Sequence, residues 1–108
     1  MISICYVPIG VATYVPMTIE NIEQHCARVG QVRATDYRYL DLVTALGKAE
    51  SGVFDKEAVR VKLIGLDSEP VYIDNLGGVS RGARHLRLSA SSLTMVKRLI
   101  EGVTNPRV

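Results

Sequence analysis

Histidine and cysteine are scarce in this chain, and each occurs only twice among its 108 residues. The four residues have neither the clustering nor the CxxC spacing of a zinc site, which argues against a bound metal. Two cysteines also provide no disulfide framework. We therefore expect Cys5 and Cys26 to be small buried residues that are not bonded to each other.

Sequence motifs for catalysis and cofactor binding are also missing. No Walker A or dinucleotide fingerprint is present, and no lysine–serine pair follows Gly77, Gly78 and Gly82, which are better explained as hairpin turns. His25 and Cys26 are adjacent, and neighbouring helical residues point about 100° apart, so they do not face each other. A histidine and a cysteine brought together by the fold stay an open alternative. We predict no enzyme, no catalytic residue, no cofactor and no small-molecule substrate.

Charged residues are absent from the first 17 positions. This run lacks the basic start of a signal peptide, and Pro8, Gly10 and Pro16 interrupt it. It is also too short to span a bilayer. These features predict a cytoplasmic protein without membrane contact.

The overall composition is that of a globular protein, with 47% hydrophobic and 22% charged residues. A length of 108 residues suits one domain, residues 1–108. It is also long enough to bury a core without obligatory staples.

Two segments repeat apolar residues at helical spacing. Asp36 is a good N-cap for a helix over Tyr37–Ala49, and Ser89 for a helix over Ala90–Glu101, which Gly102 would end. The apolar stripes of both predict one buried face each.

The N-terminal third is harder to assign. Ile2–Val7 alternates like a strand, and Thr18 as an N-cap predicts a short helix that ends before Gly30. Residues 8–16 either form a return strand or continue the first strand irregularly. Residues 27–34 favour strand in part.

From Val59 to Leu88 the apolar period changes to two, with turn residues at 67–70, 77–78 and 82. This pattern predicts an antiparallel meander. The expected fold class is α+β, with an antiparallel sheet (the meander in the C-terminal half) packed against two to three helices. The expected core consists of Leu42, Leu46, Val61, Leu63, Ile73, Leu86, Val96 and Leu99.

Acidic residues are missing between Asp74 and Glu101, a stretch that holds five basic ones, and the chain carries a net charge of +2. A solvated basic face is the simplest interpretation. Arginines on a strand pair also contact phosphates, but the aromatic residues that stack on bases are not interleaved with them. The residues concerned lie on or beside one hairpin: Arg81, Arg84, His85 and Arg87.

The order of elements in the second half resembles that of small bacterial immunity proteins of polymorphic toxin systems, including contact-dependent growth inhibition. An alternating charged strand precedes a strand with a tyrosine, a glycine-bounded return, a leucine–serine cap and a closing amphipathic helix. The segments are Val59–Leu63, Val71–Asp74, Gly78–Arg81 and Leu86–Ile100. The resemblance implies a stoichiometric inhibitor of one cognate toxin domain, and it identifies no functional residue.

We therefore expect a protein-binding inhibitor with a cognate toxin as partner. Inhibitors that mask nuclease sites are typically acidic, so this slightly basic chain is expected to bind an acidic patch or a surface away from the catalytic cleft. A nucleic-acid-binding module that uses the hairpin around 81–87 and an accessory subunit of a larger assembly are the alternatives. Aromatic and arginine anchors dominate many interfaces, and the expected partner-binding residues are Tyr37, Arg38, Arg81, Arg84, His85 and Arg87.

Overall fold

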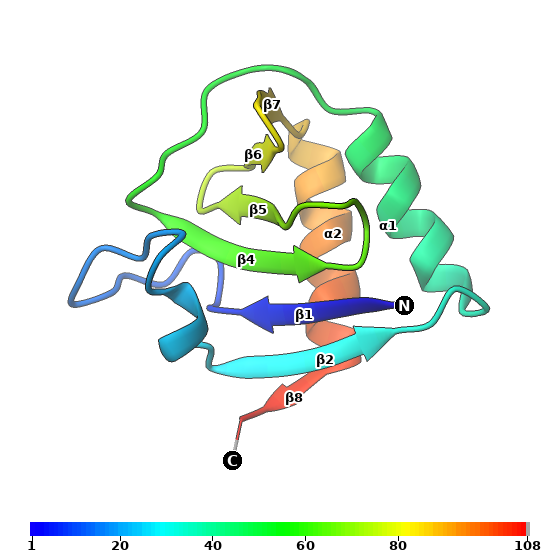
Figure 1. Cartoon of the computed structure of the whole chain (residues 1–108), viewed down its shortest axis with the longest axis horizontal. Helices are drawn as coiled ribbons and strands as arrows, with labels where there is room; N and C mark the ends of the chain where they lie inside the picture. Colours follow the sequence, from blue (N-terminus) through cyan, green and yellow to red (C-terminus); the bar gives the residue numbers. More distant parts are fainter. Residues whose placement is uncertain (108) are drawn as a thin grey trace.

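An antiparallel sheet runs through the computed structural model, which describes residues 1–107 (Figure 1). Its strands are β1 (Ile2–Tyr6), β2 (Arg28–Val32), β3 (Glu50–Ser51), β4 (Val59–Ile64), β5 (Val71–Asp74), β6 (Gly78–Arg81), β7 (Arg84–Arg87) and β8 (Thr104–Pro106). Their order across the sheet is β3-β7-β6-β5-β4-β1-β2-β8. The predicted meander is thus β4 to β7, and β1 joins it to β2 and β8.

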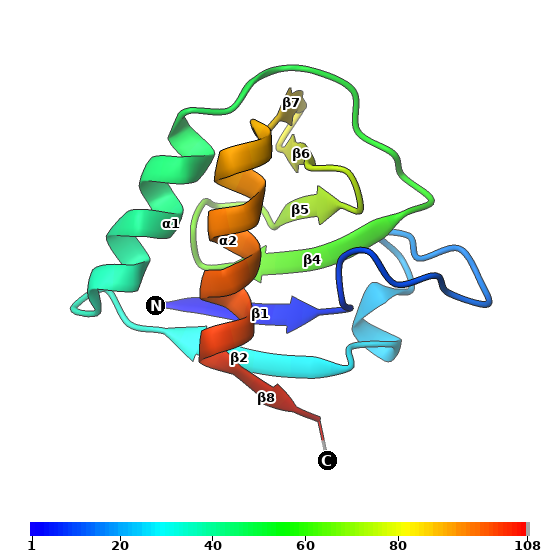
Figure 2. The same ribbon diagram turned by 180° about the vertical axis from the view of Figure 1, so that it is seen from behind.

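Two helices, α1 (Tyr37–Gly47) and α2 (Ala90–Val103), cover the same face of the sheet (Figure 2). Both begin at the predicted caps. The Asp36 carboxylate accepts from the Arg38 backbone N–H at 2.9 Å, and the Ser89 hydroxyl accepts from the Ser92 N–H at 3.1 Å. The α+β class, with the sheet packed against helices, is confirmed.

The C-terminal end of α2 differs from the prediction. Gly102 was expected to follow the helix, but it lies inside α2, which continues to Val103. The Thr104 hydroxyl donates to the Ile100 carbonyl at 2.7 Å, and the chain then turns directly into β8. A side-chain hydroxyl therefore satisfies a carbonyl of the last turn. In many other helices, backbone N–H groups at and after a left-handed glycine do this.

The main core lies between the sheet and the two helices. All eight residues expected in it are buried, and β1 adds Ile2, Ile4 and Tyr6. Because side chains alternate along a strand, Ser3 and Cys5 point to the opposite, helix-free face. A second cluster forms on that face from Val7, Met17, Ile22, Phe54, Val59 and Tyr72.

Two edge strands escaped the sequence prediction. Glu50–Ser51 pairs with β7, and Thr104–Pro106 pairs with β2. Strands of two and three residues are too short to show an alternating pattern, so only their neighbours in the sheet define them.

The helix expected after Thr18 is wrong. Its first turn begins as predicted, because the Thr18 hydroxyl accepts from the Asn21 N–H at 3.3 Å, but only the short 3-10 helix η1 (Ile22–Gln24) follows. Ile22 is buried on the helix-free face, and the chain enters β2 at Arg28. The return to the sheet therefore limits this segment to a single turn.

The buried stripe of α1 gives a direct test of the core. Leu46 is 1% exposed and Leu40, on the same helix, is 66% exposed. We expect Leu46→Ala to lower the free energy of unfolding by about 2–5 kcal/mol in urea melts, because it leaves a cavity. Leu40→Ala should change it by less than about 0.5 kcal/mol. Equal small effects at both sites would show that the stripe is misassigned.

Tyr6 provides a second test, through pH. Its buried hydroxyl donates to the Glu101 carboxylate at 2.9 Å and accepts from the Ile9 N–H at 3.2 Å. Burial raises the pKa of Tyr6 from 10.0 to about 12. The folded state therefore keeps a proton that the unfolded state loses, and the contribution of Tyr6 to stability declines as pH rises from about 10 to about 12. Urea melts should show a shallower decline in Tyr6→Phe than in wild type; identical profiles would contradict the assignment.

Candidate functional site

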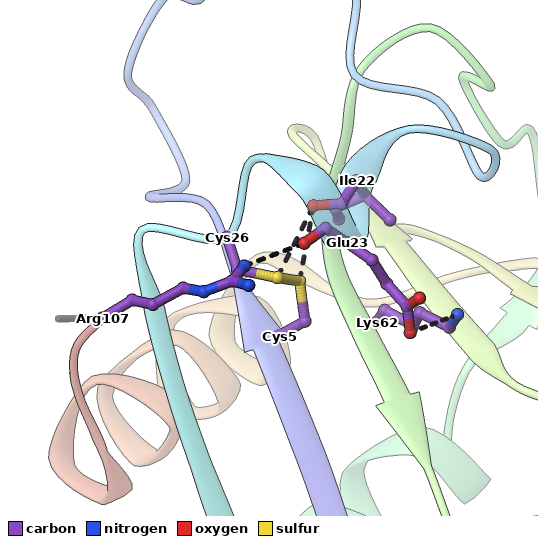
Figure 3. Close-up of a disulfide and its surroundings, with 6 residues drawn as sticks. All are labelled: Cys5, Ile22, Glu23, Cys26, Lys62 and Arg107. Carbon is purple, nitrogen blue, oxygen red and sulfur yellow. Dashed lines mark hydrogen bonds and ion pairs between the residues drawn. A yellow bond between two sulfur atoms is a disulfide. The ribbon is translucent and has the colours of Figure 1, made fainter.

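A disulfide joins Cys5 of β1 to Cys26, which lies just before β2 (Figure 3). Their Cα atoms are 5.4 Å apart, within the range that a disulfide spans. The expectation of two unpaired cysteines is therefore wrong. Cys5 points to the helix-free face, and η1 folds onto that face and brings Cys26 over it. No local spacing in the sequence signals this meeting of residues 21 positions apart.

Further contacts of Ile22 and Glu23 hold η1 in place (Figure 3). The Lys62 ammonium lies 2.8 Å from the Glu23 carboxylate, and the Arg107 guanidinium donates to the Glu23 backbone carbonyl at 2.9 Å. The Ile22 carbonyl oxygen lies 3.6 Å from Cys5 Sγ and 3.5 Å from Cys26 Sγ. The hydrogen bond from Lys62 lowers the pKa of Glu23. Because Glu23 is exposed, this ion pair adds little to stability.

A shallow groove of about 570 Å³ lies beside the disulfide on the helix-free face. Val29 and Ile64 expose apolar surface in it, and Lys62 and Arg107 contribute the positive charges. Glu23 offsets one of these charges, so the groove lacks the convergent polar groups of a built ligand site.

The disulfide closes the base of the connection between β1 and β2, whose outermost part, residues 11–15, we term the tip. In Figure 1 this connection extends beyond the sheet on the left. On one side of the tip, the Gly10 N–H donates to the Asn75 side-chain carbonyl at 2.7 Å. On the other, Met17 is buried and exchanges backbone hydrogen bonds with Glu57 and Val59, at 3.1 and 2.9 Å.

The tip itself is apolar and exposed. Val11 and Val15 are exposed and Tyr14 is fully so. No acidic or basic residue occurs before Glu20 in the chain. Within the tip, the Thr13 hydroxyl donates to the Val15 carbonyl at 2.7 Å, which holds the bend at Tyr14. Sequence reasoning left this segment open, because an apolar run without charge that Pro8, Gly10 and Pro16 interrupt suits a buried segment as well as an exposed one.

A buried arginine supports the tip from beneath. Arg60 is 4% exposed and sits at an irregularity of β4, where the register with β5 shifts. Its guanidinium donates to the carbonyls of Val59 and Val11, at 3.1 and 3.2 Å, and its Nε has no partner in residues 1–107. Burial lowers the pKa of Arg60. The contact to Val11 links the tip to the sheet.

The predicted anchors Tyr37 and Arg38 lie at the start of α1. Tyr37 is 75% exposed, and the guanidinium carbon of Arg38 lies 5.8 Å from its ring centroid. Arg38 also pairs with Asp36 at 2.7 Å, which raises the pKa of Arg38 and lowers that of Asp36. Across a groove of about 340 Å³, α2 presents Met95 and Arg98.

The predicted hairpin residues do not form one basic surface. Arg81 and Arg84 pair across β6 and β7, on the same side of the sheet as the core residue Val79. His85 lies at an alternate position on β7 and therefore faces the other side, where its ring centroid is 5.7 Å from that of Phe54. Arg81 pairs with Asp67, which lowers the pKa of this carboxylate.

Arg87 also belongs to the helix-free side of β7, opposite Gly78. The predicted site residues thus divide into a helix surface around Tyr37 and a hairpin with two faces. Five strand spacings, or about 24 Å, separate β7 from β2 across the sheet. Helix α1 begins after β2. The structure does not bring the two sets together.

Residues 1–107 contain no group of three or more histidine, cysteine, aspartate or glutamate side chains placed to hold a metal ion. None of the helices described is long and apolar enough to cross a membrane. The buried Asp74 carboxylate accepts from the backbone N–H groups of Asp55, Leu76 and Gly78, at 2.7–2.8 Å. This acid is therefore occupied in fixing the turn between β5 and β6.

No protein-family model, curated protein or solved structure matches the chain. Function must be inferred from the surface of the molecule itself.

Closure of the connection by the disulfide predicts a measurable stabilisation. It links positions 21 apart, and a loop of this length gives about 3 kcal/mol in chain-entropy models. We expect the double variant Cys5→Ser/Cys26→Ser to lose about 2–4 kcal/mol of unfolding free energy. Dithiothreitol should lower the melting temperature of wild type and leave that of the double variant unchanged. Two free thiols in the denatured, unreduced protein would contradict the bond.

Proposed function

We propose that the chain works by binding one partner protein, and that it is a stoichiometric inhibitor of the immunity-protein kind that neutralises a cognate bacterial toxin domain. The observation that carries the proposal is the grouping of large exposed apolar side chains on backbone that is held in place. Such groups on a soluble protein mark interaction sites more often than single exposed residues do.

The first group is the tip, whose exposed members are Val11, Tyr14 and Val15. It is fixed on either side by Gly10 and Met17. The second group lies where α1 and α2 pack side by side, with Tyr37 and Met95 exposed at the groove between them. Tyrosine, methionine and arginine are enriched in protein interfaces, and both groups contain tyrosine.

Binding to nucleic acid has less support from the surface. Of the hairpin residues, Arg81 already pairs with Asp67, and the ring of His85 contacts that of Phe54. Arg84 and Arg87 lie on opposite faces of the sheet by the register of β7. A phosphate backbone needs several cations on one surface, so this arrangement favours a protein partner. It leaves the identity of the partner, and a role as accessory subunit, to experiment.

The expected cytoplasmic location stays a prediction. Disulfides persist mainly in oxidising compartments, so the bond between Cys5 and Cys26 counts against it. A periplasmic or extracytoplasmic site of action would agree with both the bond and an inhibitor that meets an incoming toxin.

The proposal is tested by capture from the native host. The tagged, disulfide-bonded chain is incubated with nuclease-treated extract, and the retained material is analysed by mass spectrometry and light scattering. We expect one protein at a one-to-one ratio, and we expect its enzymatic activity to fall as the chain is added. Recovery of nucleic acid without protein from untreated extract, and of nothing after nuclease, would contradict the proposal.

A further inference from the structure

The tip differs from the helix surface in shape and in charge. It projects beyond the sheet, whereas Tyr37 and Met95 line a groove between two helices (Figure 1). The helix groove also carries Arg38, Asp41 and Arg98, while the tip has no charged residue. A convex segment of this kind fits a concave site. The site should also be uncharged, because burying an unpaired charge against an apolar segment is costly.

Hydrogen bonds hold the backbone at both ends of the tip in the free protein. Gly10, Val11 and Met17 are tied to Asn75, Arg60 and Glu57 by hydrogen bonds of 2.7–3.2 Å. The Asn21 side chain donates to the Pro16 carbonyl at 3.0 Å. Ordering a loop on binding reduces affinity, so a loop that is already held retains more of its contact energy.

The disulfide belongs to the same arrangement. Cys5 and Cys26 bracket nearly the whole connection, and Cys26 lies two residues after the end of η1. Without the disulfide, only the pairing of β1 with β2 would fix the two ends of the connection. The hydrogen bonds to the tip would then have to hold a longer and looser segment.

We propose that the tip is the docking element of this protein, and that Tyr14 enters an uncharged, concave pocket of the partner protein while the Cys5–Cys26 bond keeps the tip in its binding conformation. This inference rests on the proposed function, since it names the surface and the kind of partner site that the inhibitor uses. The aromatic ring fills the pocket, and the phenolic hydroxyl needs a hydrogen-bond partner at its far end.

The order of the tip can be tested without a partner. Chymotrypsin cleaves after exposed aromatic residues in segments flexible enough to enter its cleft. We expect the disulfide-bonded chain to resist cleavage after Tyr14, and the Cys5→Ser/Cys26→Ser variant to be cut there at least about tenfold faster. Tyr72, inside the sheet, should stay protected in both proteins. Equal cleavage rates after Tyr14 would overturn the role given to the disulfide.

Docking is tested with the protein that the wild-type chain captures at a one-to-one ratio. Tyr14→Ala should raise its Kd about thirtyfold or more, the loss typical of an interface anchor, and Tyr14→Phe should raise it less than about fivefold. Val53→Ala, at an exposed apolar residue that belongs to neither group, is the control and should stay within about twofold. Tyr37→Ala is measured beside it to test the helix surface. Each variant is first checked for an unchanged melting temperature.

The outcomes separate the two proposals. If a partner is captured and Tyr14→Ala binds within twofold of wild type, the tip is not the docking element, although the proposed function stands. A loss at Tyr37 instead would assign docking to the helix surface. Failure to capture any protein overturns both proposals. Cosedimentation of the chain with phosphatidylcholine vesicles, if it is lost in Tyr14→Ala, would assign the tip to a lipid surface. That result would overturn the proposal that the tip docks on a protein.

Discussion

Strand β1 is the element on which the rest of the molecule depends, because it pairs with β2 on one side and with β4 on the other. It thereby joins β2 and β8 to the meander. Its alternation also divides the molecule into two sides. Ile4 and Tyr6 lie in the core under the helices, while Cys5 lies on the helix-free face and bonds to Cys26. A shift of one residue in its register would exchange the two sets.

The connection that leaves β1 is consequently held at several points. Its base is closed by the disulfide, Arg60 contacts it from beneath, and Met17 is buried against the sheet. The tip is left without cover and exposes apolar side chains. An exposed apolar segment on a fixed base costs the free protein solubility, which is why we propose this segment as a binding surface.

Sequence reasoning succeeded where local rules decide the structure. Asp36 and Ser89 cap their helices, and the period-two pattern from Val59 onward forms the meander, because capping and alternation act between near neighbours. It failed where contacts between distant segments of the chain decide the structure. The pairing of Cys5 with Cys26 depends on the fold around them, and the return of the chain to the sheet leaves only a 3-10 turn where a helix from Thr18 was expected. The candidate site lies in this second category, since no motif marks residues 11–15.

The central claim is that the tip is rigid in the free protein, and NMR relaxation of backbone amides tests it most directly. For the disulfide-bonded chain, the order parameters of Val11, Thr13, Tyr14 and Val15 should lie near the value of about 0.85 that is typical of rigid backbone, and match those of β1. Values below about 0.6 at these four residues, with β1 still near 0.85, would show a flexible loop and contradict the account.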